Sequence, residues 1–443
     1  MAGRRIVMAT IGSEGDVHPF IGVALALKAR GHEPIIATRA VFQAKIEREG
    51  LGYRRLRPDT DDAEAIGLTY DEIIAGITDQ ATGLRFLIKR IVTPFIRQTY
   101  ADLEAACEGA DLMISHNLVL AAPLFAAKTG LPWLTAILQP FSFMSAYDAP
   151  ALGVSPLLDL VRRGFPPQLH RLLYRFAAQY SDSWFEPVRQ FRAELGLPLS
   201  PLTPILEGPY SPLGTLALYS KTLGPVQRDF PPNTTITGFP FYDSETGGGS
   251  QLDGKLAAFL DRGPAPIVFT LGTSAVLNPG SFFRESLDAA ARLNRRAVLL
   301  VGQDGFGALP APLPDWAIAC AYAPHSVLFP RAEAIVHQGG VGTTGQALRS
   351  GRPQLVTPHM ADQPDNAARI KRHGVGEALA PKHYAGASAA RLLARLIDRP
   401  SYQTNARQAA DIVRGEDGAE TAADTIETVL NRIRQAGQAA GKS

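Results

Sequence analysis

Residues 337–370 read HQGGVGTTGQALRSGRPQLVTPHMADQPDNAARI and follow directly on the apolar run AEAIV. This order predicts a strand, a glycine-rich turn and a helix that begins at about Thr343. Because Gly339, Gly340 and Gly342 carry no side chains, the backbone N–H groups of the turn can approach a ligand closely. The helix N-terminus adds partial positive charge. The stretch therefore predicts an anion site suited to a diphosphate.

From the residues alone, two kinds of nucleotide fit this turn. Thr343 and Thr344 can donate hydroxyl groups, and His337 can add a hydrogen bond or a positive charge. Residues 340–345 also satisfy G-x-G-x-x-G, and Asp362 lies at about the distance expected for the acidic residue of a dinucleotide site. Asp362 has a further interpretation as the cap of a helix. A dinucleotide and a sugar nucleotide both stay open at this point.

Strands and helices alternate in two separate runs along the chain. The first run starts with RRIVMATIG at residues 4–12, and the second starts with PIVFTLGTS at residues 266–274. Such alternation is typical of α/β domains in which helices cover both faces of a parallel sheet. We expect two doubly wound, Rossmann-like domains facing each other across a cleft, with ligands at the carboxyl ends of the strands.

The domain boundary falls near a glycine- and serine-rich stretch, SETGGGSQL, at residues 244–252. We assign residues 1–222 to an N-terminal domain, 223–250 to a linker and 251–443 to a C-terminal domain. The last helix, over residues 420–437, is a candidate to pack back on the N-terminal domain.

The composition argues against several classes of protein. Lys and Arg number 44 against 42 Asp and Glu, and the resulting net charge of +2 gives no reason to expect nucleic acid as a partner. Cys107 and Cys320 are too few for a disulfide framework and fit a reducing cytoplasm. No apolar run reaches the roughly 18–20 residues of a membrane-spanning helix. We expect a cytoplasmic monomer or weak homodimer, for which contact with a membrane surface stays open.

The order H-x-G-G-x-G-T, G-x-P and P-x-x-x-D-Q-x-x-N-A resembles the donor signature of the UDP-glycosyltransferase superfamily, which has the GT-B fold. The bacterial branch, with rhamnolipid rhamnosyltransferases and antibiotic and sterol glycosyltransferases, is the most similar. The resemblance extends to GSEGDVHPFIGVALALKARGH at residues 12–32, TGFPFYD at 237–243 and FTLGTS at 269–274. The matching signature residues are His337, Gly339, Gly340, Gly342, Thr343, Gly351, Pro353, Pro358, Asp362, Gln363, Asn366 and Ala367.

This resemblance implies a role for each donor-site residue. The His-Gly-Gly segment would hold the diphosphate through His337, Gly340, Gly342 and Thr343. Asp362 and Gln363 would bind hydroxyls of the donor sugar. The remaining implied contacts are stacking of the base on Tyr322, a base-edge contact at the Ala323 backbone, and phosphate contacts from Thr273 and Ser274. From its residue type alone, Tyr322 would instead be an ordinary half-buried strand aromatic.

The resemblance also points to the catalytic base. Glycosyl transfer with inversion needs a base that deprotonates the acceptor hydroxyl. The segment Gly15-Asp16-Val17-His18-Pro19 places Asp16 at the base position of the antibiotic and sterol branches, with His18 displaced by two residues. Asp16 also suits a helix cap, and His18 stays a second candidate because its ordinary pKa is near 6.5.

Aromatic and proline-rich segments in the N-terminal half predict the acceptor site. We expect acceptor contacts from His116, Phe141, Phe143 and Met144, although each of them also suits the protein core. Spaced apolar residues over 169–191 predict an amphipathic helix. Two interpretations are open for the arginines along this apolar region, a solvated basic face or a face for an anionic membrane surface or acidic lipid acceptor. These arginines are Arg162, Arg163, Arg171 and Arg175.

No metal or other cofactor is expected. Asp59-Thr60-Asp61 forms a D-x-D, the metal motif of the other major glycosyltransferase fold, but here it precedes a predicted helix and suits caps. No His/Cys cluster has zinc spacing, and a triphosphatase P-loop is absent. We therefore expect a metal-independent, inverting hexosyltransferase that moves rhamnose or glucose from a dTDP- or UDP-sugar to a phenolic, lipid or sterol-like hydroxyl. The alternatives are an NAD(P)-dependent oxidoreductase and a non-catalytic protein that binds sugar nucleotides or lipids.

Overall fold

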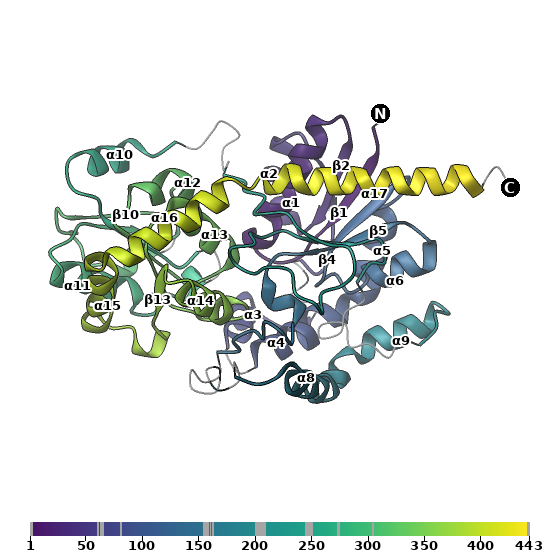
Figure 1. Cartoon of the computed structure of the whole chain (residues 1–443), viewed down its shortest axis with the longest axis horizontal. Coiled ribbons are helices and arrows are strands. Elements are labelled where there is room, and N and C mark those ends of the chain that lie inside the picture. The colour runs from purple at the N-terminus through teal and green to yellow at the C-terminus, as the bar shows by residue number, and fades with distance from the viewer. Residues whose placement is uncertain are drawn as a thin grey trace.

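The chain forms two parallel β-sheets, one in each half, surrounded by helices (Figure 1). This architecture comes from a computed structural model. The model describes residues 3–59, 62, 66–79, 82–153, 159, 161, 164–199, 210–243, 251–272, 275–303 and 305–440.

In the described part of the first half, seven strands form a sheet in the order β3-β2-β1-β4-β5-β6-β7, and every neighbouring pair is parallel. The strands are β1 (Arg5–Ala9), β2 (Glu33–Thr38), β3 (Gly52–Arg55), β4 (Leu112–His116), β5 (Trp133–Ile137), β6 (Thr215–Ala217) and β7 (Thr234–Ile236). Strand β7 lies inside the segment 223–250 that we predicted to be linker. The N-terminal domain therefore runs further than expected, because this short run pairs with β6 as the edge of the sheet.

The described residues of the second half form a six-stranded parallel sheet in the order β10-β9-β8-β11-β12-β13. Its strands are β8 (Ile267–Thr270), β9 (Ala297–Leu300), β10 (Ala317–Cys320), β11 (Ala334–His337), β12 (Gln354–Val356) and β13 (Gly376–Ala378). The two-domain α/β prediction is confirmed.

Helices connect the strands in both halves. In the first half they are α1 (Glu14–Ala29), α2 (Gln43–Arg48), α3 (Tyr70–Thr78), α4 (Gly83–Phe86), α5 (Ile96–Ala106), α6 (Ala122–Thr129), α8 (Pro167–Ser181) and α9 (Glu186–Glu194). In the second half they are α10 (Gly254–Asp261), α11 (Phe282–Arg292), α12 (His325–Leu328), α13 (Val341–Ser350), α14 (Gln363–Arg372), α15 (Gly386–Asp398), α16 (Pro400–Arg414) and α17 (Gly418–Ala440).

Each sheet is buried on both faces, as a doubly wound domain requires. Successive side chains of a strand point to opposite faces. Along β1, Ile6 and Met8 pack into one buried cluster, whereas Val7 and Ala9 pack into another. The strands of the second sheet divide in the same way between two clusters. This explains why the strands read as continuous apolar runs rather than as alternating ones.

The last helix returns to the N-terminal domain. Helix α17 buries Ala422 and Ile426 in the same cluster as Phe20 of α1, and Figure 1 shows α17 lying across this domain. Arg30, the C-cap residue of α1, also forms an ion pair with Glu427 of α17 at 2.8 Å. The C-terminal helix therefore joins the two domains, as its predicted position suggested.

The amphipathic helix predicted over residues 169–191 is interrupted. It consists of α8 and α9, separated by a 3₁₀ turn at Asp182–Phe185. Helix α9 buries Val188 and Phe191, but α8 leaves much of its apolar side exposed. Among the described residues, no helix is long and apolar enough to cross a membrane.

Candidate active site

The predicted site residues gather where each sheet reverses its strand order. In the first sheet the reversal lies between β1 and β4, and in the second between β8 and β11. Open parallel sheets bind ligands at the carboxyl ends of such strands, because the connections leave there in opposite directions. Asp16 follows β1, His116 ends β4 and His337 ends β11. Strand order therefore places both predicted halves of the site at the two reversal points.

Asp16 lies in the first turn of α1, three residues after the N-cap Ser13. Its Oδ2 accepts hydrogen bonds from the Ser13 backbone N–H at 2.8 Å and from the Ser13 hydroxyl at 3.1 Å. Gly12 has a φ of 136°, and a Cβ at this position would come within 2.2 Å of Oδ2. The helix-capping interpretation of Asp16 is therefore confirmed, and the carboxylate is fixed at the start of α1 through one of its oxygens.

His18 has a different environment from the one a general base needs. Its Nε2 lies 3.1 Å from the Lys45 ammonium, which also pairs with Glu14 at 3.0 Å. Burial, together with the Lys45 charge, lowers the pKa of His18 to about 4. The ring also packs edge-on against Tyr242, with centroids 5.2 Å apart. Because Nε2 accepts from Lys45, the neutral ring carries its proton on Nδ1 and has no free lone pair to take a proton, so the geometry favours Asp16 over His18.

His116 is buried at the end of β4, with 2% of its surface exposed. Neither ring nitrogen has a hydrogen bond of good geometry, although the Ile11 backbone lies close by. Burial lowers the pKa of His116, and the Asp16 charge opposes this shift. The predicted base and the predicted acceptor residue are therefore neighbours, and burial favours the neutral form of His116.

His337 holds the glycine turn together. Its Nδ1 accepts from the Gly339 backbone N–H at 3.1 Å, and its Nε2 lies 2.9 Å from Oε1 of Gln354. This pairing selects the tautomer with the proton on Nε2. Burial lowers the pKa of His337 to about 4. The positive charge that we considered for His337 is therefore absent near neutral pH, and both ring nitrogens are engaged within the protein.

The turn itself is built for close backbone approach. Gly339 has a φ of +91°, and a Cβ there would lie 2.7 Å from Val356. Helix α13 starts two residues earlier than predicted, at Val341, with Gly340 as its N-cap. The first bond within the helix joins the Thr344 N–H to the Gly340 carbonyl at 2.9 Å. The N–H groups of residues 341–343 precede that bond and point toward the helix N-terminus, where an anion binds.

Gly342 and Thr343 differ in their exposure. Gly342 is exposed, with open space where a Cβ would be, whereas the Thr343 side chain is buried and lies 3.4 Å from Nε2 of Gln338. The amide of Gly342 is therefore the more accessible group of the two for a phosphate oxygen.

Asp362 and Gln363 lie at the start of α14, behind the glycine turn. The Asn366 side-chain amide donates to Asp362 Oδ2 at 2.6 Å and to the Gly339 carbonyl at 2.8 Å, so it joins the helix to the turn. Gln363 Oε1 accepts from the backbone N–H groups of His359 and Met360 at 2.7 and 3.0 Å. The side-chain carbonyl of Gln363 therefore stabilises the preceding loop. The side-chain NH₂ group of Gln363 is the part that suits a sugar hydroxyl.

The negative charge of Asp16 acts on Asp362 across the domain boundary. Burial, followed by the negative charge of Asp16, raises the pKa of Asp362 to about 7. The contribution from Asp16 indicates that the start of α1 and the start of α14 lie within Coulombic range of each other. This coupling brings the predicted base of one domain to the predicted sugar-binding residue of the other.

Tyr322 follows β10 and is 41% exposed, so it is not the half-buried strand residue that its type alone suggested. Its ring lies 6.4 Å from that of His325, centroid to centroid. Ala323 is buried at 2% exposure, so only its backbone could contact a ligand. Thr273 and Ser274 lie outside the described residues.

The predicted acceptor residues divide into two kinds. Phe143 is 7% exposed and stacks on Phe230 with centroids 3.9 Å apart, inside a cluster that also contains Leu348 of α13. For Phe143 the structure therefore supports the core interpretation. Phe141 and Met144 are half-buried at a 3₁₀ turn that follows β5.

The D-x-D segment has a structural role at its first residue. Asp59 is buried and accepts a hydrogen bond from the Ala40 backbone N–H at 2.7 Å, beside Arg39 and Arg55. Its other two positions, 60 and 61, lie outside the described residues. Within the described ranges, no group of three or more His, Cys, Asp or Glu side chains is arranged to hold a metal ion.

Comparisons with known proteins cover nearly the whole chain. Residues 6–116 match the glycosyltransferase family 28 N-terminal domain, and residues 284–427 match the erythromycin biosynthesis protein CIII-like C-terminal domain. O-mycaminosyltylonolide 6-deoxyallosyltransferase of Streptomyces fradiae is 31% identical over 96% of this chain and 97% of its own length. The chain belongs to the UDP-glycosyltransferase superfamily. Family membership removes the oxidoreductase interpretation of the glycine turn.

Two further comparisons bear on length and fold. A sterol 3-beta-glucosyltransferase of Pichia angusta is 28% identical over 98% of this glycosyltransferase, which spans only 34% of that protein. The solved structure of spinosyn rhamnosyltransferase SpnG, complexed with thymidine diphosphate, superimposes with a TM-score of 0.66 at 18% identity and covers 96% of this chain and all of that one. The glycosyltransferase has the GT-B fold.

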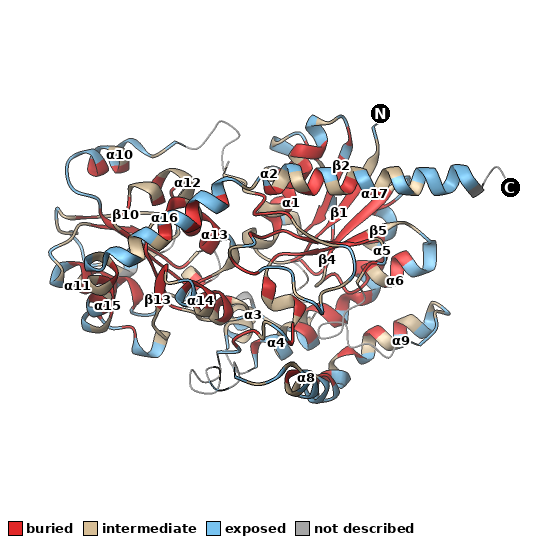
Figure 2. Cartoon of the chain, in the orientation of Figure 1, coloured by how far each residue is buried: buried red, intermediate tan, exposed pale blue. Residues whose placement is uncertain are grey.

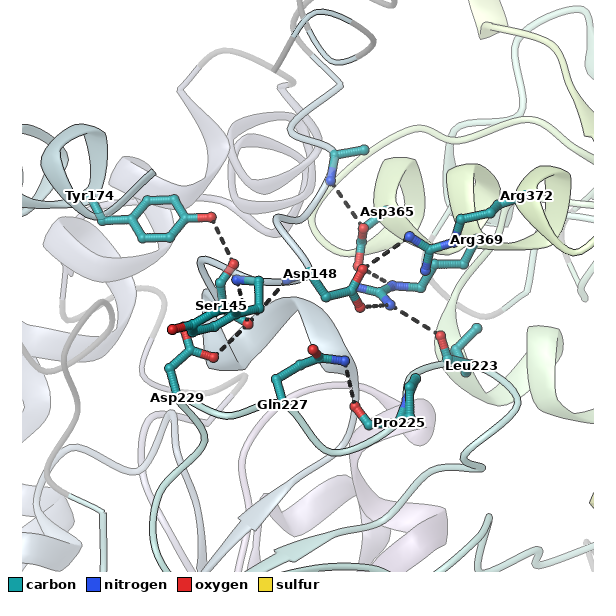
Figure 3. A network of polar contacts seen from close by, with 12 residues as sticks. Ser145, Asp148, Tyr174, Leu223, Pro225, Gln227, Asp229, Asp365, Arg369 and Arg372 are labelled. Atoms are coloured by element: carbon teal, nitrogen blue, oxygen red, sulfur yellow. Dashed lines mark hydrogen bonds and ion pairs between the residues drawn. The ribbon is translucent and has the colours of Figure 1, made fainter. Parts of the chain in front are cut away.

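A buried ionic network connects the two domains of the glycosyltransferase beside its site (Figure 3). Arg369 of α14 is 2% exposed and pairs with Asp148 of the N-terminal domain at 2.5 Å and with Asp365 of its own helix at 2.7 Å. It also donates to the Leu223 carbonyl at 3.1 Å. Asp365 in turn accepts from the Ala151 backbone N–H at 3.0 Å.

This network was missed in the sequence. The spacing of Asp365 and Arg369 by four residues was a signal for a pair on one helix face. Nothing in the sequence pointed to Asp148 or Leu223 as their partners, because these contacts span 221 and 146 positions along the chain. The network fixes the N-terminal loop around residue 148 to the helix that carries Asp362 and Gln363.

Proposed function

We propose that this glycosyltransferase moves a hexose, with inversion, from a dTDP- or UDP-sugar to a hydroxyl of a hydrophobic small molecule. The observation that carries the proposal is the effect of the Asp16 charge on Asp362. It indicates that the candidate base, Asp16, lies near the candidate sugar-binding residue, Asp362. A protein that only binds sugar nucleotides would not need a carboxylate fixed next to the donor sugar, on the side where the acceptor binds.

In the proposed reaction, Asp16 takes the proton of the acceptor hydroxyl. The acceptor oxygen forms a bond to the anomeric carbon while the bond from that carbon to the diphosphate oxygen breaks. The nucleoside diphosphate leaves with the electron pair. A base and a leaving group on opposite sides of the sugar give inversion at the anomeric carbon.

Helix α13 supplies stabilisation of the leaving group. Charge builds up on the departing diphosphate, and preoriented N–H groups stabilise such charge without rearranging. The accessible amides at the start of α13, above all that of Gly342, suit this role. His337 contributes by fixing the Gly339 amide rather than through a charge of its own. This account needs neither a metal nor another cofactor.

The donor is proposed from the site and from the names of the relatives. Exposed Tyr322 suits stacking on a pyrimidine base, and Asp362 with the Gln363 amide suits sugar hydroxyls. One relative transfers a 6-deoxyallosyl group, another glucose, and the rhamnosyltransferase structure holds thymidine diphosphate. Rhamnose on dTDP and glucose on UDP are therefore the two donors to test first.

The acceptor is proposed to be a hydrophobic molecule of phenolic, lipid or sterol-like character. The Streptomyces fradiae relative acts on O-mycaminosyltylonolide and the Pichia angusta relative on a sterol. Half-buried Phe141 and Met144, near the reversal point of the first sheet, suit an apolar acceptor surface.

A thermal-shift panel with dTDP, UDP, dTDP-rhamnose and UDP-glucose tests the donor. Binding only to the folded state raises the melting temperature, and we expect one base to give a clearly larger shift. Product formation with sterol and macrolide acceptors, followed by the anomeric configuration in NMR spectra, then tests transfer and inversion. Donor binding without any transfer would favour the non-catalytic alternative, and retention of configuration would contradict the proposed mechanism.

A further inference from the structure

Helix α8 turns its apolar side outward. Leu172, Phe176 and Tyr180 are 46%, 61% and 71% exposed, and their spacing of four residues puts them on one side of the helix. The residues that α8 buries are His170, Ala178 and Ser181, which are small or polar. An ordinary surface helix buries its apolar stripe instead. Figure 2 shows α8 largely exposed at the edge of the molecule.

Basic side chains flank this apolar stripe. Arg171 and Arg175 each precede a stripe residue by one position, so they lie about 100° around the helix from Leu172 and Phe176. Both arginines are exposed. We refer to Leu172, Phe176, Tyr180, Arg171 and Arg175 together as the α8 face.

The stripe continues onto the neighbouring loop. Tyr147, which is 43% exposed, lies under the Arg171 guanidinium, 5.4 Å from the ring centroid, and its hydroxyl accepts from Arg171 at 3.4 Å. Tyrosines with an apolar ring and a polar tip suit the boundary between water and lipid.

Among the described residues, neither Arg171 nor Arg175 forms an ion pair with an acidic side chain. Residues 160–181 contain four arginines and no Asp or Glu, and Asp159 directly precedes them. The acids that follow, Asp182 and Glu186, are both paired with Arg189, at 2.7 and 2.6 Å. The α8 face therefore combines an apolar stripe with a local positive charge.

We propose that the α8 face docks this glycosyltransferase on an anionic lipid surface. The stripe would enter the boundary between headgroups and acyl chains, and the arginines would pair with lipid phosphates. A second copy of the chain is the less suitable occupant, because a two-fold contact would bring Arg171 and Arg175 of both copies together. The proposal does not depend on the donor or the acceptor of the reaction.

Vesicle flotation with the full chain tests this inference. We expect the protein to float with phosphatidylcholine vesicles that contain phosphatidylglycerol, to remain with the soluble fraction when phosphatidylcholine is the only lipid, and to detach as salt is raised. The double variant Phe176→Ser/Tyr180→Ser should weaken binding at least about tenfold. Arg171→Gln/Arg175→Gln should weaken it by about fivefold for each arginine.

Matched variants elsewhere control for general effects. Phe306→Ser removes a comparably exposed aromatic residue from the C-terminal domain, and Arg432→Gln/Arg434→Gln removes two exposed charges from α17. Both controls should float like the parent protein. Folding of every variant is checked by its melting temperature and by the shift that dTDP or UDP produces, since the nucleotide site lies in the other domain.

A local readout comes from Trp184, whose ring lies 5.9 Å from that of Tyr180. Brominated lipids should quench the fluorescence of the bound protein, and Trp184→Phe should remove most of this quenching. Failure of the parent protein to bind anionic vesicles would overturn the proposal, as would unchanged binding by Phe176→Ser/Tyr180→Ser. If sedimentation shows a dimer that this variant dissolves, without vesicle binding, the α8 face is a contact between copies instead.

Discussion

The carboxylates of Asp16 and Asp362 belong to different domains, yet the charge of Asp16 helps to raise the pKa of Asp362 to about 7, in addition to the effect of burial. The ionisation of Asp362 therefore depends on the charge of Asp16. The pH dependence of stability in solution can therefore report on how the two domains are arranged.

The first prediction concerns pH. The native protein retains a proton on Asp362 that an unfolded chain, with an aspartate pKa of about 3.9, has already released. The contribution of Asp362 to the free energy of unfolding therefore falls as pH rises from about 4 through 7. An asparagine does not titrate, so Asp362→Asn should not lose stability in this way as pH rises. Its melting temperature relative to that of the parent protein should therefore rise between about pH 5 and pH 8.

Asp16→Asn provides the cross-check, because removing the neighbouring charge should move the titration of Asp362 to lower pH. Asp315→Asn, at an exposed acid of the C-terminal domain, is the control. An identical pH profile for Asp362→Asn and the parent protein would contradict the coupling.

The second prediction separates the two candidate bases. Asp16→Asn should lower kcat by about 10²–10⁴-fold, the usual contribution of a general base, while thermal shifts with the donor stay near those of the parent. His18→Gln should retain most of the turnover, because the pKa of about 4 and the Lys45 contact keep His18 from acting as the base. The reverse pattern in steady-state kinetics would assign the base to His18.

The third prediction concerns the glycine turn. His337→Ala removes the acceptor of the Gly339 N–H and the partner of Gln354. Because each lost hydrogen bond costs about 1 kcal/mol and a stranded buried group more, we expect nucleoside diphosphate affinity to fall by roughly tenfold or more. Calorimetric titration measures this. His359→Ala, at a half-buried histidine on the nearby loop, is the comparison, and equal affinities in parent and His337→Ala would remove His337 from the diphosphate site.

The fourth prediction concerns metal. Because the amides at the start of α13 are proposed to stabilise the leaving diphosphate, turnover should persist after dialysis against EDTA. Adding back Mg²⁺ or Mn²⁺ should change kcat little. A loss of activity that either cation restores would show that a metal shares this role.

The fifth prediction tests Arg369 as a positioning residue. Arg369→Met removes the ion-pair partner of the buried Asp365 and leaves Asp148 with Arg372 alone, so it should lower the free energy of unfolding by about 3–5 kcal/mol. Arg369→Lys keeps the charge but loses the planar fork. It should raise the KM for the sugar nucleotide while the Kd of the nucleoside diphosphate stays constant, because α14 carries the sugar contacts and α13 the phosphate contacts.

Arg372→Lys is the matched control for this pair of variants, since Arg372 pairs with Oδ1 of Asp148 at 3.0 Å and its side chain is 43% exposed. A parallel loss of diphosphate and sugar-nucleotide affinity in Arg369→Lys would indicate a purely structural role for Arg369.

The sequence by itself determined the two-domain α/β fold, because apolar strand runs and amphipathic helices are local patterns of side chains. It also determined the strand–glycine–helix turn, since glycines at fixed positions report backbone geometry directly. The signature from His337 to Ala367 and the segment around Asp16 were sufficient to indicate the glycosyltransferase family.

Only the tertiary structure decided what the individual side chains do. His337 and His18 are both neutral because burial lowers the pKa of each ring. The Lys45 charge adds to this effect at His18, whereas the hydrogen bond with Gln354 opposes it at His337. Phe143 belongs to the core because Phe230 covers it, and the network of Arg369 forms because the chain brings Asp148 to it. The charge state, the burial and the bonding partners of a side chain depend on residues that are distant in the chain. A local sequence pattern does not say which distant residues will contact it.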